Sequence, residues 1–280
     1  MRGLWLAGCG LAVLGVVYGL QRPFWQLPGV EYSHFETPAD SNERTEFAFT
    51  RLMFPPGEND GYSSTGRFTG DYHLGLSLWT QDYPRADRHF SLALKRLTRI
   101  HTRSAEQPVN LDDGDQYDFP WLYAVQVGEW GLTDKQAAEL REYLLRGGFF
   151  MADDFHGALE WEMFEKRIKK VFPDRPIVDI QDDDPIFHTV YDITDRIQVP
   201  GAAHVRLGYK RPDYSRGADD GRGAHWRAIY DDHGRVMVAI SYNSDIGDGW
   251  EWADEPQYPV KYSDLAIRLG VNYVVYAMTH

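Results

Sequence analysis

Cysteine is almost absent from this chain. The sequence of 280 residues contains a single cysteine, Cys9, near its amino end. One cysteine excludes an intrachain disulfide and a multi-cysteine metal site, and it leaves the rest of the chain without a thiol nucleophile. The remainder of the sequence is therefore compatible with a compartment of either redox state.

Positive charge is also scarce. Lys and Arg number 29 against 42 Asp and Glu, which gives a formal net charge of −13. Such a chain repels a phosphate backbone unless basic side chains gather locally. The two basic clusters, at 95–99 and 165–170, fall on segments with the spacing of amphipathic helices, where a solvated face explains them. We therefore expect no nucleic acid partner.

Familiar catalytic motifs are missing as well. The sequence has no G-x-S-x-G nucleophile elbow, no glycine-rich phosphate loop, no HExxH and no EF-hand spacing. It gives no reason to assert catalysis, so whether the protein is an enzyme stays open at this stage. The substrate or ligand, the partner and the oligomeric state stay open too.

The longest uncharged run lies at the amino end. Residues 4–20 lie between Arg2 and Arg22, and 17 residues of helix span about 26 Å, close to a bilayer core. We expect residues 1–22 to be a transmembrane anchor or a signal segment, and the anchor is favoured because no small-x-small cleavage site follows. The positive amino end then favours an inside amino terminus, with the rest of the chain across the membrane. Residues 23–45, with three prolines, predict a stalk.

Residues 46–280 alternate between strand-like and helix-like segments. Apolar runs predict strands at 46–54, 119–125, 149–152 and 175–180, and helical periodicity predicts helices at 86–100, 133–148, 159–173 and the carboxyl end. Thr133 and Gln136 predict a capping box. The alternation indicates one α/β domain with a mostly parallel sheet covered on both faces. We also expect a long loop at 55–85 and, from two strand-like runs within 226–242, a hairpin that forms an antiparallel margin or a lobe near 200–260.

Polar residues follow several of the predicted strands. The strand at 149–152 ends in Asp153 and Asp154, which could instead cap the next helix. The carboxyl ends of parallel strands form the ligand-binding edge of an open sheet. If the loops at 153–156, 181–188 and 243–255 share that edge, their acid, amide and imidazole groups converge: Asp153, Asp154, His156, Asp183, His188, Asn243, Asp245, Asp248 and Glu251.

Carboxylates, an amide and an imidazole favour calcium, magnesium or manganese over zinc. Asp153, Asp154 and His156 are the metal candidates, and solvated acidic turns are the alternative. Arg51, amid apolar neighbours, predicts either an anionic ligand or a structural ion pair. Tryptophans in the same loops, Trp250 among them, suit contact with a sugar face or packing in the core.

Several ordered motifs resemble the bacterial family called domain of unknown function 4159. They span about residues 46–280 and include FAFTRLMFP (47–55), WTQDYPRADRHF (79–90), LREYLLRGGFFMADDFHG (140–157) and NSDIGDGWEW (243–252). The resemblance implies a fold similar to class I glutamine amidotransferases and trehalose-utilisation-type domains, a flavodoxin-like, Rossmann-like three-layer sandwich. It also implies exported or membrane-attached proteins without established activity. The amidotransferase cysteine has no counterpart here, so that chemistry is not carried over.

These observations favour a non-catalytic, membrane-tethered domain of the cell envelope. It would bind a protein partner or another ligand at the carboxyl edge of its sheet. Two alternatives remain open: a metal-assisted hydrolase of an envelope glycan that uses Asp153, Asp154 and His156, and a sugar-binding module.

Overall fold

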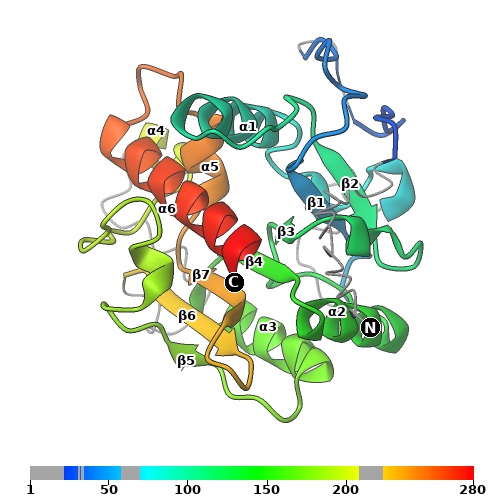
Figure 1. The fold of residues 1–280 in the computed structure, drawn as a ribbon, viewed down its shortest axis with the longest axis vertical. Coiled ribbons are helices and arrows are strands. Elements are labelled where there is room, and N and C mark those ends of the chain that lie inside the picture. Colours follow the sequence, from blue (N-terminus) through cyan, green and yellow to red (C-terminus); the bar gives the residue numbers. More distant parts are fainter. Residues whose placement is uncertain (1–21, 31, 33–34, 58–69, 208–222) are drawn as a thin grey trace, which may run out of the picture.

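A seven-stranded sheet forms the centre of the molecule. The computed structural model describes residues 22–30, 32, 35–57, 70–207 and 223–280. The strand order is β2-β1-β3-β4-β7-β6-β5 (Figure 1). The parallel strands are β1 (Thr50–Met53), β2 (Gln107–Asn110), β3 (Trp121–Ala124), β4 (Phe149–Phe155) and β7 (Val236–Tyr242). The chain is therefore mixed α/β with a mostly parallel sheet, as the sequence predicts.

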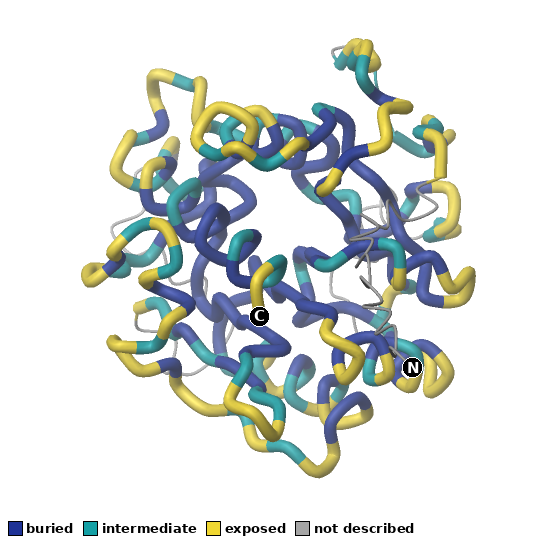
Figure 2. Tube along the Cα trace, in the orientation of Figure 1, coloured by how far each residue is buried: buried dark blue, intermediate teal, exposed yellow. Residues whose placement is uncertain are grey.

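Helices cover both faces of this sheet. On one face lie α2 (Asp134–Leu145) and α3 (Gly157–Val171); on the other lie α1 (Arg85–Leu97), α5 (Ile246–Glu251) and α6 (Val260–Thr279) (Figure 1). Side chains alternate along the strands, so Leu122 packs with the first pair and Tyr123 with the second group. Figure 2 shows the resulting buried centre, and this arrangement fits a three-layer sandwich.

The predicted capping box is present at the start of α2. Thr133 Oγ1 accepts a hydrogen bond from the Gln136 amide at 3.1 Å, and Gln136 Oε1 accepts one from the Thr133 amide at 3.2 Å. After the helix, Gly147 adopts a φ of +107°, a backbone conformation that suits glycine. The chain then enters β4 directly at Phe149, which fixes where the acids after that strand emerge.

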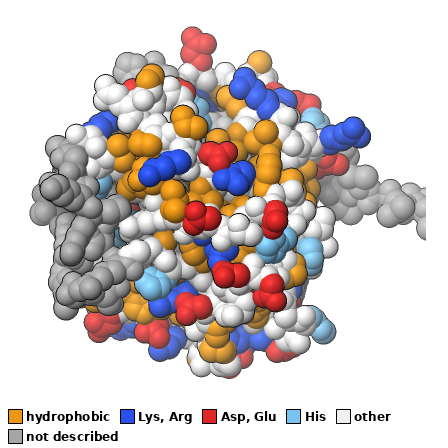
Figure 3. Space-filling model, turned by 90° about the vertical axis from the view of Figure 1, so that its left-hand side faces the viewer, with side chains coloured by type: hydrophobic (Ala, Val, Ile, Leu, Met, Phe, Trp, Pro, Cys, Tyr) orange, Lys and Arg blue, Asp and Glu red, His pale blue; other side chains and the backbone are white. Residues whose placement is uncertain are grey.

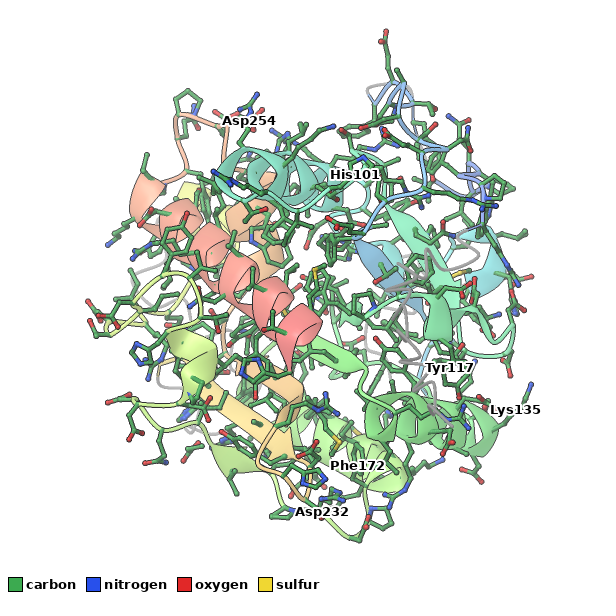
Figure 4. All side chains as sticks on the ribbon, viewed as in Figure 1. His101, Tyr117, Lys135, Phe172, Asp232 and Asp254 are labelled. Carbon is green, nitrogen blue, oxygen red and sulfur yellow. The ribbon has the colours of Figure 1, made fainter. Side chains whose placement is uncertain are left out.

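The hairpin belongs to the main sheet. The strand β6 (His225–Tyr230) pairs antiparallel with β7, and the short β5 (Val178–Asp179) pairs antiparallel with β6. Of the two predicted arrangements, the described strands form the antiparallel margin of the sheet. Figure 4 labels Asp232 in the hairpin turn and Asp254 beyond α5, at opposite ends of the molecule. The chain therefore returns after β7 to the carboxyl edge of the sheet.

Residues 23–45 do not form the predicted stalk where the structure describes them. Leu27 is 2% exposed and belongs to the core on the α2 and α3 side. The Gly29 amide donates to the Leu74 carbonyl at 2.7 Å. Arg88 donates to the carbonyl oxygens of Phe35 and Glu36 at 3.2 and 2.9 Å. The prolines suggested a spacer, but apolar burial ties the segment to the domain.

The predicted anchor at 1–22 lies outside the described residues, apart from Arg22. Within the described part of the chain, no helix has the length and apolar character needed to cross a bilayer.

Short elements complete the fold. The described part of the loop at 55–85 contains two 3-10 turns, η2 (Tyr72–Leu74) and η3 (Leu78–Thr80). A short helix, α4 (Ala202–Leu207), precedes β6. The sequence did not predict β2, whose residues QPVN lack the usual strand pattern and which lies at the end of the sheet order.

Candidate metal centre

The acids after the apolar part of β4 lie in an irregular end of the strand. Ala152 pairs with Ile240 and Phe155 with Tyr242, so β4 takes three steps where β7 takes two. Such an extra residue is a bulge, which redirects side chains at a strand end. Asp153 and Asp154 occupy the bulge, and β4 therefore runs through both acids instead of stopping before them.

Strained backbone gathers at this edge. Within the described chain, the residues other than glycine with positive φ have values between 51° and 61°, and they are Asp82, Gln126, Asp154 and Asn243. Gln126 follows β3 and Asn243 follows β7, while Asp154 is the residue before the last one of β4. Asp and Asn tolerate this conformation better than most residues, but its clustering is typical of functional sites. The backbone thus marks the edge independently of side-chain chemistry.

Asp153 supports the start of α5. Its Oδ2 accepts hydrogen bonds from the Tyr123 hydroxyl at 2.8 Å and the Gly247 amide at 2.9 Å, and its Oδ1 accepts one from the Ile246 amide at 3.2 Å. Burial, with the neighbouring Asp154 charge, raises the pKa of Asp153 to about 7. Asp154 does not make the helix cap considered for it, since the N-cap of α3 is His156 without a side-chain cap bond. Asp153 instead accepts from the first two amides of α5.

Five further carboxyl groups meet beside this support, and we call them the acid cluster. They form two groups of three, each with oxygen atoms within 4.8 Å of one another. Asp82 belongs to both groups; Asp154 and Asp245 complete one, and Asp248 and Glu251 complete the other. All but the half-buried Glu251 are buried.

Hydrogen bonds hold most of these carboxylates in place. Asp154 Oδ2 accepts from Gln126 at 2.5 Å, and Asp154 Oδ1 lies 3.0 Å from His156 Nε2. Asp245 caps α5 by accepting from the Asp248 amide at 2.8 Å. Asp248 in turn accepts from the Ala202 amide at 2.5 Å and from the Trp252 indole at 3.0 Å.

Asp82 is the exception. Its Oδ1 accepts a hydrogen bond from Gln81 at 2.9 Å, but its Oδ2 is buried and has no hydrogen-bond partner. The residue is 8% exposed. Leaving a buried carboxylate oxygen unpaired is destabilising, and native proteins normally supply a partner.

Proximity of the acids opposes their ionisation. Burial, and then the charges of Asp248, Glu251 and Asp154, raise the pKa of Asp82 well above its usual range, while Arg51 opposes the rise. Burial and the Asp154 charge do the same to the pKa of Asp245. Burial and Asp248 raise the pKa of Glu251 to about 8. The acid cluster therefore needs protons or cations to be stable.

Arg51 forms a structural ion pair. It is fully buried and contacts the Asp87 carboxylate through two nitrogen atoms. Its remaining nitrogen donates to the Gln81 carbonyl at 2.9 Å and the Trp79 carbonyl at 3.4 Å. Of the two predicted roles, the structure shows the pair, and its contact with Gln81 fixes the turn that presents Asp82.

The other residues predicted from the sequence lie in two loops, and only one of these loops reaches the acid cluster. Asn243 Oδ1 accepts from the Gly157 amide at 2.9 Å and so supports the start of α3. Trp250 is fully buried, donates to the Ala266 carbonyl at 2.8 Å and packs on Phe90, so it is a core residue. The loops at 153–156 and 243–251 therefore meet, as predicted.

The loop at 181–188 does not join them. Asp183 is exposed, and His188 contacts the Asp192 carboxylate and, at 2.8 Å, the Asp182 carbonyl within its own segment. Ile186 and Phe187 anchor this loop in the core, and Asn272 of α6 accepts from the amides just beyond it. These contacts account for its path away from the acid cluster.

The five tryptophans near the predicted loops offer little flat surface for a sugar. Trp79, Trp130 and Trp250 are fully buried. The guanidinium carbon of Arg227 lies 4.2 Å from the centre of the Trp161 ring. The guanidinium carbons of Arg85 and Arg206 lie 4.5 and 3.9 Å from the centre of the Trp252 ring. On the face drawn in Figure 3, acidic and basic side chains lie side by side among hydrophobic ones. The acid cluster thus differs from that mixed surface by being buried and of one sign.

Sequence reasoning missed Asp82, Gln126 and Tyr123. Asp82 lies in WTQDYPRADRHF, a motif behind the family resemblance, but a long loop precedes it and no predicted strand end located it. Gln126 and Tyr123 belong to the predicted strand at 119–125 or directly follow it, and they carry no charge to attract notice. Position after a strand was the available signal for Gln126.

The comparison with known proteins gives one family. None of the curated proteins compared with the chain matches it. The family model described as domain of unknown function (DUF4159) matches residues 72–278, a range that contains every member of the acid cluster. Because the match covers well over half of the sequence, the chain belongs to the DUF4159 family.

Proposed function

We propose that this domain binds a divalent cation at the carboxyl edge of its sheet and uses that site to bind a ligand or partner. The observation that carries the proposal is Asp82 Oδ2, a buried carboxylate oxygen without a hydrogen bond among four other carboxyl groups. A cation would supply the missing partner and balance the repulsion that raises the pKa values of the acid cluster.

The ligand set favours magnesium, manganese or calcium. The acid cluster offers carboxylate oxygens, which hard divalent cations prefer, and it contains no thiol. His156 contacts Asp154 through its ring nitrogen and so supports that acid from behind. Of the three metal ligands predicted from the sequence, we therefore keep Asp154, whereas Asp153 and His156 position the ligands.

The wider setting remains part of the proposal. The three-layer arrangement is consistent with a flavodoxin-like sandwich similar to class I glutamine amidotransferase-like domains. We propose a bacterial envelope domain, tethered to the inner membrane by residues 1–22 and exposed to the periplasm, with a protein or glycan as partner. A metal-assisted hydrolase of envelope glycans is the second candidate, because the half-buried Glu251 leaves one side of the acid cluster near solvent.

Thermal unfolding of the full-length protein with and without cations tests the proposal. Binding to the folded state stabilises it by about 2.7 kcal/mol when the cation is at a hundred times its dissociation constant. We expect Mg²⁺, Mn²⁺ or Ca²⁺ to raise the melting temperature of the wild type and of Asp183→Asn, an exposed acid outside the cluster. Asp82→Asn should lose the response. A wild type that responds to none of the three cations would contradict the proposal.

A further inference from the structure

We infer that the acid cluster holds two divalent cations bridged by Asp82, an inner one between Asp154 and Asp245 and an outer one between Asp248 and Glu251. This inference rests on the proposed function, since it specifies how many ions the same site takes and which one can meet a ligand. It starts from the division of the cluster into two groups that share one residue.

The geometry provides two places for an ion. In each group of three, the ligand atoms lie within 4.8 Å of one another, a spacing that one cation can span with bonds of about 2.1 to 2.5 Å. Asp82 belongs to both groups, and a single carboxylate can bridge two ions about 3.5 to 4 Å apart. The unpaired Oδ2 of Asp82 is the atom available for that bridge.

The charge of the fully ionised cluster is also better balanced by two cations than by one. One divalent cation balances two of the five negative charges, whereas two cations balance four of them. With only one cation bound, the uncompensated negative charge of the ionised carboxylates would lie among buried side chains, where it is strongly destabilising. Arg51, which opposes the rise in the pKa of Asp82, is already paired with Asp87.

Glycine keeps room open beside the inner position. A Cβ atom added to Gly247 would lie 2.9 Å from Asp82 Oδ2 and 3.6 Å from Asp245 Oδ1. Any side chain there would compete with an ion for these oxygens. All three carboxylates of the inner group are buried, so the inner ion is shielded from solvent.

The outer position faces a basic rim. Its ligand Glu251 is half-buried, and its ligand Asp248 accepts a hydrogen bond from Trp252, whose ring contacts Arg85 and Arg206. Burial and Asp248 raise the pKa of Glu251, and the Arg85 charge opposes this rise, so the guanidinium is near enough to influence this ligand. The outer ion, flanked by arginines, would coordinate an anionic oxygen ligand such as a phosphate or carboxylate group.

Manganese binding to the full-length protein tests the inference. We expect two Mn²⁺ per chain by elemental analysis and calorimetry, and an electron paramagnetic resonance spectrum with exchange coupling between the ions. Glu251→Gln should lose the outer ion and Asp245→Asn the inner one, so that each variant binds one uncoupled ion. Asp264→Asn, an exposed acid on α6 paired with Arg268 and not with the basic rim, serves as the matched control and should retain two.

The outcomes separate the two proposals. One Mn²⁺ per wild-type chain would overturn the second ion and leave the proposed function standing, whereas no bound Mn²⁺ would overturn both. Two ions without exchange coupling would exclude the Asp82 bridge. If Asp245→Asn fails to fold, Glu251→Gln alone decides, because a variant that still binds two coupled ions contradicts the assignment of the outer site.

Discussion

Asp153 on β4 and Gly247 at the start of α5 are joined by a hydrogen bond of 2.9 Å across 94 positions of sequence. Through this contact and the neighbouring one from Ile246, the sheet fixes the position of α5. Asp245 caps this helix, Asp248 lies within it and Glu251 is its last residue. Asp154, the residue after Asp153, faces the other acids instead. Two adjacent carboxylates in the same bulge thus have different roles, one supporting a helix and one offered as a ligand.

Asp153→Asn should destabilise the protein. The amide group of asparagine would face either the Gly247 amide and Tyr123 hydroxyl or the Ile246 amide, so at least one donor loses its acceptor. An unsatisfied buried donor costs about 1 to 3 kcal/mol. Chemical denaturation near pH 8, where the carboxyl of pKa about 7 is ionised, measures the loss. A variant as stable as the wild type would show that Asp153 does not hold α5.

Asp154→Asn provides the contrast. Its partners are the side chains of Gln126 and His156 and not a helix end, so the destabilisation expected of Asp153→Asn should be absent. Because it removes one negative charge from the acid cluster, the cation-free protein should become more stable by up to about 1 to 2 kcal/mol. The thermal response to Mg²⁺ should fall sharply. A response equal to that of the wild type would remove Asp154 from the ligand set.

Gly247→Ala should weaken cation binding, whereas a control variant with a similar loss of stability should not. The added Cβ would lie 2.6 Å from the Tyr123 hydroxyl and 2.9 Å from Asp82 Oδ2, so it crowds the inner position. Gly270→Ala is the matched control, because its Cβ would meet the Phe90 ring at 2.4 Å and the Trp250 ring at 2.9 Å, away from the cluster carboxylates. Both changes should destabilise by about 1 to 3 kcal/mol. Calorimetry with Mn²⁺ should show a tenfold or greater loss of affinity, about 1.4 kcal/mol, for Gly247→Ala alone.

Stability of the cation-free protein should fall as the pH rises from about 4 to about 8. Asp153 and Glu251 have pKa values of about 7 and about 8 in the folded protein, above those of an unfolded chain, because both are buried near other acids. The folded state therefore binds more protons than the unfolded state in this interval, and its advantage is lost as those protons leave. Melting temperatures in a chelating buffer measure the slope. Glu251→Gln should flatten its upper part, and a wild type more stable near pH 8 than near pH 5 would contradict the expectation.

Adding Mg²⁺ should reverse this pH dependence. Cations compete with protons for the same carboxylates, so their stabilising effect should increase as the pH rises toward 8 and should be small near pH 5. The same melting experiment with excess Mg²⁺ in place of chelator checks this.

The sequence predicts the part of the site that regular structure controls. Parallel strands share a carboxyl edge, so the acids after 149–152 and after the hairpin could be brought together by reasoning alone. Asp82 could not, because its place depends on the path of a long loop and on the contact between Arg51 and the Gln81 carbonyl. His188 was placed wrongly for the converse reason: Ile186 and Phe187 are buried and carry its loop away.

The same limit applies to the amino-terminal segment. Prolines and polar residues at 23–45 resemble a spacer, yet a few side chains decide whether such a segment packs. Local composition predicts helices and strands because the spacing of their apolar residues follows the local backbone geometry. The docking of an irregular segment depends instead on distant surfaces such as the η2 turn and α1.

Leu27→Ala tests that docking directly. Leu27 is 2% exposed in the core on the α2 and α3 side, so truncating it should destabilise the protein by about 2 to 4 kcal/mol. Leu159→Ala, at a side chain that is 52% exposed on α3, should change stability by less than about 0.5 kcal/mol. Denaturant unfolding of both variants compares them. If Leu27→Ala behaves like Leu159→Ala, the segment is only loosely attached, which would favour the spacer. A loss of the expected size means that truncations of this protein should begin before residue 22, since a cut at 46 would remove part of the core.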